Sequence, residues 1–71
     1  MPEEVAQTFI RDMLVEYSPT GSTFDEVVNF IIEDCNYVND IKVSDIFEKY
    51  HDYAIECYTN IRIITHNPGE F

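Results

Sequence analysis

The hydrophobic residues near the start of the chain repeat at the spacing of an amphipathic helix. They are Val5, Phe9, Ile10, Met13, Leu14 and Tyr17. Steps of three and four residues place such positions on one side of a helix, so we expect a helix over residues 3–17 with that side in a core. Pro2 suits the first turn, and Glu3 suits the positive end of the helix dipole. The segment SPTGS, residues 18–22, combines proline with glycine and predicts a turn.

A second amphipathic helix is predicted from Thr23, and one of its apolar residues falls outside the apolar stripe. Thr23 and Glu26 have the spacing of a capping box, which marks a helix start. The apolar stripe consists of Phe24, Val27, Val28, Ile31, Ile32 and Cys35. Phe30 lies instead among the polar residues Asn29 and Glu33. It is therefore either a contact for another protein or a residue covered by a further layer of the domain.

A third apolar segment follows the turn-favouring residues 36–40, NYVND. Ser44 or Asp45 is a suitable cap for its first helix. One face of the segment carries Ile46, Tyr50, Tyr53, Ala54, Cys57 and Ile61, with Phe47 and Tyr58 at its border. The pattern fits one long helix or two short ones. Residues 61–65 are rich in β-branched side chains and fit a short strand as well as a helix.

These segments predict an all-α fold, a small compact bundle of three to four helices. If residues 61–65 form a strand, the bundle ends in a short C-terminal β-like segment. A chain of 71 residues has room for one domain, which we expect over residues 1–66. Residues 67–71 form a predicted C-terminal tail, since Asn67 precedes a proline and is biased away from helix.

The charge of the chain is strongly negative. Fourteen Asp and Glu residues against four Lys and Arg give a formal net charge of −10. Proteins that bind nucleic acid directly need cations to neutralise phosphates, so we expect no direct nucleic-acid binding. An acidic surface suits a basic protein partner, although solubility alone also explains it.

The acidic residues recur at steps of three and four positions in two parts of the chain. They are Asp12 and Glu16 in the first part, and Asp45, Glu48, Asp52 and Glu56 in the second. Neighbouring like charges on a helix cost a few tenths of a kcal/mol per pair. The rows therefore fit an acidic binding surface, for which the alternative is an ordinary solvated face.

The chain has no sequence signal for a membrane or secretion. No apolar run approaches membrane-spanning length, and the acidic start contains no hydrophobic signal region. We expect a cytoplasmic protein. Cys35 and Cys57 lie on apolar faces and are expected to be buried, reduced thiols rather than a disulfide.

No catalytic or ligand-binding motif is evident. His51 and His66 are the only histidines, and neither has a cysteine or histidine at zinc-binding spacing; His51 is expected to be solvated. Two glycines, Gly21 and Gly69, do not make a phosphate loop. Residues 39–48, NDIKVSDIFE, lack the glycine of a calcium loop. We expect no enzymatic activity, no metal and no cofactor.

The order of the three segments resembles the late-transcription coactivators of T-even-type phages. The segments are FIRDMLVEY, STFDEVVNFIIEDC and IFEKYHDYAIECYTNIR. The positions that match the family pattern are Phe9, Ile10, Met13, Thr23, Phe24, Glu26, Val27, Lys49, Ala54, Ile55 and Ile61. The likeness covers roughly residues 9–62 and depends on apolar spacing rather than on a rare motif.

This resemblance implies a helical protein without catalysis that binds the flap of the bacterial RNA polymerase β subunit. Such coactivators occupy a surface that host sigma region 4 uses, work beside a phage sigma-like factor, and contact the DNA sliding clamp through a C-terminal acidic-hydrophobic peptide. The matching end of this chain is NPGEF, with Glu70 and Phe71, which departs from that peptide. The loop SPTGS is also longer than the family pattern.

The predicted function is thus a small acidic phage protein that binds host RNA polymerase as a transcription coactivator. Its candidate partner-binding residues are Phe30, Ile55, Ile63, Glu70 and Phe71. The alternative is an acidic DNA mimic that inhibits a host nucleic-acid-binding or defence protein. A third hypothesis rests on the similarity of FIIEDC and VSDIFEKYHDYAIE to a helical DNA-binding module of viral primase-helicases, which the charge opposes.

Overall fold

The computed structural model describes residues 1–65, except for the side chains of residues 64 and 65. Its elements are α1 (Glu3–Tyr17), the 3₁₀ turn η1 (Ser18–Thr20), α2 (Phe24–Asp34), β1 (Tyr37–Val38), β2 (Ile41–Lys42), α3 (Val43–Lys49) and α4 (His51–Thr65). Four helices and one small hairpin confirm the predicted all-α bundle with a short β segment. The predicted tail over residues 67–71, with Glu70 and Phe71, and residue His66 lie outside the described residues.

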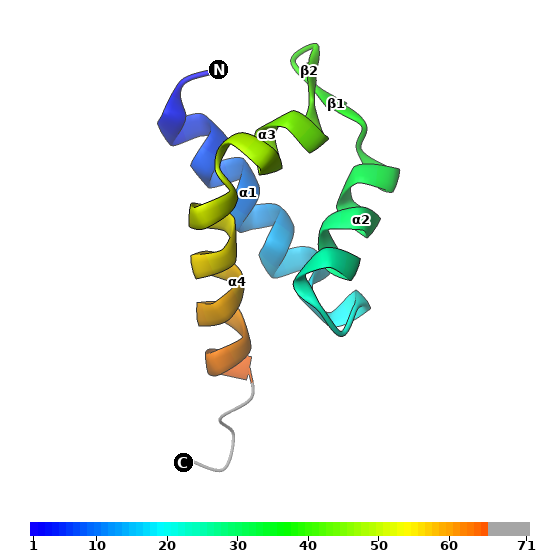
Figure 1. Cartoon of the computed structure of the whole chain (residues 1–71), viewed down its shortest axis with the longest axis vertical. Helices are drawn as coiled ribbons and strands as arrows, with labels where there is room; N and C mark the ends of the chain where they lie inside the picture. Colours follow the sequence, from blue (N-terminus) through cyan, green and yellow to red (C-terminus); the bar gives the residue numbers. More distant parts are fainter. Residues whose placement is uncertain (66–71) are drawn as a thin grey trace.

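Helix α1 is the centre of the fold. It packs most extensively against α4 and also against α2, so these two helices flank it, while α3 crosses between them on the side of the hairpin (Figure 1). The core comprises Ala6, Ile10, Leu14, Val27, Ile31, Val43, Ile46, Phe47 and Ala54. Every helix supplies at least one of these residues, so the core depends on all four helices.

The buried side of α1 differs from the predicted stripe. Ala6, Ile10 and Leu14 are buried, whereas Val5, which the spacing assigns to the apolar stripe, is 48% exposed. Val5 is exposed because of where the flanking helices lie. Helices α2 and α4 cover the side of α1 that carries Ile10, and Val5 lies outside the covered side.

A hydrogen bond ties the end of α1 to the end of α2. The Tyr17 hydroxyl donates to Asp34 Oδ2 over 2.7 Å. The bond raises the pKa of Tyr17 above its ordinary value of 10.0, because an ionised phenolate cannot donate and is repelled by the carboxylate.

The Tyr17→Phe variant is expected to lose less stability than the wild type as the solution becomes alkaline. The raised pKa means that the unfolded chain releases the Tyr17 proton first, so the contribution of this bond is complete below about pH 10 and disappears as the pH rises through the folded-state pKa. Urea unfolding of both proteins from neutral pH to about pH 11.5 measures the difference. If the free energy of unfolding of the two proteins changed with pH in the same way, the hydrogen bond would make no contribution to stability.

The start of α2 has the predicted cap. The Glu26 backbone N–H donates to Thr23 Oγ1 over 3.2 Å, as the capping box requires. The return bond is displaced by one residue, since Glu26 Oε1 accepts from the Ser22 N–H over 2.7 Å. Val27 and Ile31 are buried and the rest of the stripe is half-buried, which confirms the predicted core face.

The predicted turn at residues 36–40 is the tip of a hairpin. Tyr37 pairs with Lys42 and Val38 with Ile41, and the two residues between the strands, Asn39 and Asp40, have φ of 52° and 66°. Positive φ at both central positions is the geometry of a type I′ turn, which asparagine and aspartate tolerate. The short β segment therefore lies here and not at residues 61–65, which are helical.

The third segment forms two helices, α3 and α4. Tyr50 interrupts them with φ −109° and ψ 35°. The predicted cap at Ser44 or Asp45 is wrong, because α3 begins at Val43 and Lys42 is its cap residue, without a side-chain hydrogen bond. Instead, helix α3 begins directly after strand β2 of the hairpin.

Candidate protein-binding surface

Three apolar residues predicted to lie off the core faces are exposed. Phe30 on α2 is 41% exposed, and Ile55 and Ile63 on α4 are 40% and 53% exposed. The alternative that a further layer covers them does not hold within residues 1–65. Exposed large apolar side chains suit a contact with another protein.

Ile55 and Ile63 share the outer side of α4. They are eight residues apart, and at about 100° per residue Ile55 lies about 100° and Ile63 about 180° from the buried Ala54 around the helix. The axial rise between the two isoleucines is about 12 Å at 1.5 Å per residue. Phe30 belongs to α2, the other flanking helix, so two candidates lie on the exposed side of α4 and one lies separately on α2.

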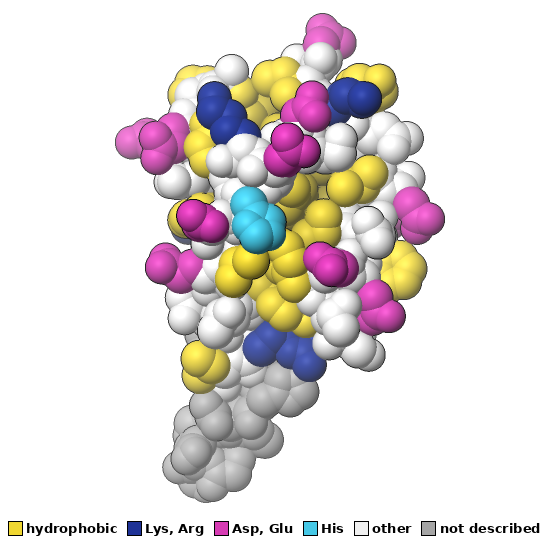
Figure 2. All heavy atoms as spheres, viewed as in Figure 1, with side chains coloured by type: hydrophobic (Ala, Val, Ile, Leu, Met, Phe, Trp, Pro, Cys, Tyr) yellow, Lys and Arg dark blue, Asp and Glu magenta, His cyan; other side chains and the backbone are white. Residues whose placement is uncertain are grey.

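An aromatic cluster joins the start of α2 to α4. The Phe24 ring meets the His51 ring edge to face at 5.8 Å between centroids, and the Tyr58 ring at 5.6 Å. The Arg62 guanidinium lies over the Tyr58 ring at 5.6 Å. Figure 2 shows hydrophobic side chains in a strip between α4 and α2, with acidic side chains around it.

His51 is exposed as expected but also packs against Phe24, which connects it to this cluster. Its Nδ1 lies 3.7 Å from Asp52 Oδ1. The sequence did not indicate the contact, because residues 24 and 51 are distant along the chain and no short-range spacing relates them.

The Tyr58 hydroxyl within this cluster is buried and has no hydrogen-bond partner among the described residues. A buried hydroxyl without a partner costs free energy, because it has lost its bonds to water. The phenyl ring alone would keep the edge-to-face contact with Phe24 and the position under Arg62.

The Tyr58→Phe variant is therefore expected to be more stable than the wild type by about 1 kcal/mol. The measurement is the free energy of unfolding in urea. Tyr37→Phe is the matched control, because Tyr37 is exposed and its hydroxyl is hydrated, so the same chemical change should have little effect there. A clear loss of stability in Tyr58→Phe would mean that the hydroxyl has a favourable partner.

The predicted acidic residues are all exposed, but they do not form one continuous row. They are Asp12 and Glu16 on α1, Asp45 and Glu48 on α3, and Asp52 and Glu56 on α4. The helix break at Tyr50 separates the second group into two pairs on different helices. The Arg11–Asp12 ion pair at 3.8 Å is exposed and therefore weak.

Further exposed apolar residues were not predicted. Val15 is 57% exposed, and Val5 and Phe9 line an open hollow of about 430 Å³ on α1 together with Glu4 and Thr8. Val15 could have been found, since the helical spacing already separates it from Ile10 and Leu14. The exposure of Val5 could not have been predicted, because its position in the helical repeat is that of a core residue.

The remaining reactive side chains are dispersed. No cluster of three or more His, Cys, Asp or Glu residues suitable for a metal ion occurs in residues 1–65. Cys35 and Cys57 are unlinked and half-buried rather than fully buried, and Cys35 Sγ lies 3.6 Å from the Tyr37 carbonyl oxygen. A side-chain hydrogen bond with Cys57 raises the pKa of Tyr53. Within the described part of the chain, no helix is long and apolar enough to cross a membrane.

Comparison with known proteins gives no match: no family model, no curated protein and no solved structure is similar to the chain. The likeness to phage late-transcription coactivators therefore stays a prediction.

Proposed function

We propose that this chain is a non-catalytic phage protein that binds host RNA polymerase and modulates transcription as a coactivator. The observation that carries the proposal is the exposure of Phe30 on the polar side of α2. A partly exposed aromatic side chain is a suitable anchor, because a partner pocket that covers it removes its remaining apolar area from solvent.

The charge of the chain supports a basic surface on that partner. A net charge of −10 accelerates association with a positively charged protein and disfavours close approach of a second acidic copy. The resemblance names the β-subunit flap as the docking surface, with a phage sigma-like factor and the sliding clamp as further partners. The clamp contact would use Glu70 and Phe71, which lie outside the described residues.

The test is direct binding to purified bacterial RNA polymerase core enzyme. The chain is immobilised, and the enzyme is applied in two forms, intact and with the β flap deleted. Retention of the intact enzyme and loss of retention without the flap are expected. Absence of retention of the intact enzyme would contradict the proposal.

A second candidate is an acidic inhibitor that resembles DNA. It is favoured by the exposed carboxylates on α1, α3 and α4 and by the small number of Lys and Arg residues in the chain, four against fourteen Asp and Glu. Such binding depends on exposed charge, so raising the salt concentration should weaken it strongly. Binding that resists salt would support the apolar contact at Phe30 instead.

A further inference from the structure

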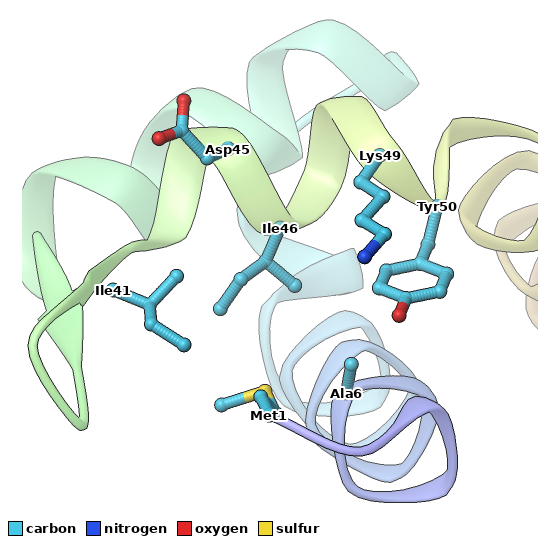
Figure 3. Close-up of a pocket in the computed structure, with 7 residues that line it drawn as sticks. All are labelled: Met1, Ala6, Ile41, Asp45, Ile46, Lys49 and Tyr50. Carbon is cyan, nitrogen blue, oxygen red and sulfur yellow. The ribbon is translucent and has the colours of Figure 1, made fainter.

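A small cavity lies where the N-terminal end of α1, strand β2 and helix α3 meet, away from Phe30 and the outer side of α4. Its volume is about 120 Å³, and its lining residues are Met1, Ala6, Ile41, Asp45, Ile46, Lys49 and Tyr50. Figure 3 shows the side chains of Met1, Ile41 and Ile46 converging on the same space. Apolar groups therefore line about half of the cavity, and polar groups line the rest.

Two hydrogen-bond donors lie at one side of this cavity. Lys49, the last residue of α3, and Tyr50, which follows it, project toward α1 on the same side as Ile46 (Figure 3). The Lys49 ammonium lies 5.5 Å from the centre of the Tyr50 ring. Within residues 1–65, the Lys49 ammonium has no carboxylate within ion-pair distance, and the Tyr50 hydroxyl makes no hydrogen bond.

The missing ion pair of Lys49 is informative because a carboxylate is close along the chain. Asp45 lies one helical turn before Lys49, at a spacing that allows an ion pair. Its carboxylate instead points away from the cavity, while the Lys49 ammonium points toward it (Figure 3). Lys49 is exposed, so its ammonium is hydrated in the free protein and remains available to a ligand at the edge of the cavity.

We propose that this cavity binds a small apolar carboxylate, with the hydrocarbon end against Ile41 and Ile46 and the carboxylate on Lys49 and Tyr50. A fully apolar cavity of about 150 Å³ holds a benzene molecule, so the apolar part of this smaller cavity has room for a short branched aliphatic group. An ammonium and a hydroxyl together satisfy the two oxygens of a carboxylate. The site is independent of polymerase binding.

The negative charge of the chain does not prevent this binding at ordinary ionic strength. The Debye length is about 8 Å at physiological salt, so carboxylates farther than this from the cavity repel the ligand only weakly. Asp45 lines the cavity, but its carboxylate points away from it, whereas the Lys49 ammonium points toward it (Figure 3).

The test is a titration of the whole chain, labelled with ¹⁵N, with 4-methylpentanoate and with its neutral isostere 4-methylpentanamide. The carboxylate is expected to shift the amide signals of Ile41, Ile46, Lys49 and Tyr50, and the amide to bind about tenfold more weakly, a difference of about 1.4 kcal/mol. Equal binding of the two compounds, or no shift with either one, would overturn the proposal.

Two lysine variants supply the matched controls. Lys49→Met removes the ammonium at the cavity and should weaken carboxylate binding about tenfold. Lys42→Met changes the net charge equally, but Lys42 does not line the cavity, so binding should remain unchanged. The same loss in both variants would overturn the assignment of Lys49.

The source of the carboxylate is distinguished with N-acetyl-leucine and N-acetyl-leucinamide. If N-acetyl-leucine bound more tightly than 4-methylpentanoate, the result would support the proposed site and identify its ligand as the C-terminal residue of a peptide. The reverse order would support it with a free aliphatic acid. Preference for the leucinamide would overturn it.

Discussion

Replacing Leu14 by alanine is expected to lower the free energy of unfolding by about 3 kcal/mol or more. Leu14 is completely buried on α1, the helix against which both α2 and α4 pack. The smaller side chain would lose apolar burial and leave a cavity that three helices cannot easily close. The total stability of a 71-residue chain is roughly 4–10 kcal/mol, so this loss is a large part of it.

The measurement is urea unfolding followed by the helical circular dichroism signal. Val15→Ala is the matched control, because residue 15 is the next position on the same helix and is 57% exposed. Its effect should stay within about 0.5 kcal/mol. Similar losses in the two variants would mean that Leu14 is not at the centre of the core.

The second large effect is expected in binding rather than in folding. If Phe30 anchors the contact with RNA polymerase, Phe30→Ala should weaken that binding by about thirtyfold, corresponding to about 2 kcal/mol. The free energy of unfolding should change by less than about 1 kcal/mol, since the side chain is already 41% exposed.

Two further variants locate the effect. Tyr37→Ala removes another exposed aromatic ring and should leave the affinity for polymerase unchanged. Ile31→Ala, at the buried neighbouring position, should destabilise the fold by about 2–5 kcal/mol. A destabilisation of about 3 kcal/mol or more in Phe30→Ala would instead identify Phe30 as a core residue.

The predictions that the structure confirmed depend on short-range physics. The first helix is found over Glu3–Tyr17, and the cap of α2 uses Thr23 and Glu26, because caps and helical spacing involve residues at most four positions apart. The turn at Asn39 and Asp40 was predicted for the same reason. Its flanking strands were not, since two residues are too few to show an alternating pattern.

Predictions about residues 61–65 required information from distant parts of the chain. Their β-branched side chains fit a strand as well as a helix, and the structure has them at the end of α4. The extensive packing of α4 along α1 favours the helix, and no neighbouring strand is present in the described residues to pair with them. The cavity beside Lys49 is likewise lined by residues that are far apart in the sequence, from Met1 to Tyr50.

The sequence by itself determined the positions of the first two helices, the turn between α2 and α3, the exposure of the acidic residues, and the exposure of Phe30 on the polar side of its helix. Each depends on the residue and its near neighbours. The tertiary structure alone decided that Val5 is exposed while Ala6 is buried, that Tyr50 separates two helices, and that Lys49 lies beside an apolar cavity. Burial depends on which distant element covers a residue, and that element is set by packing of the whole chain.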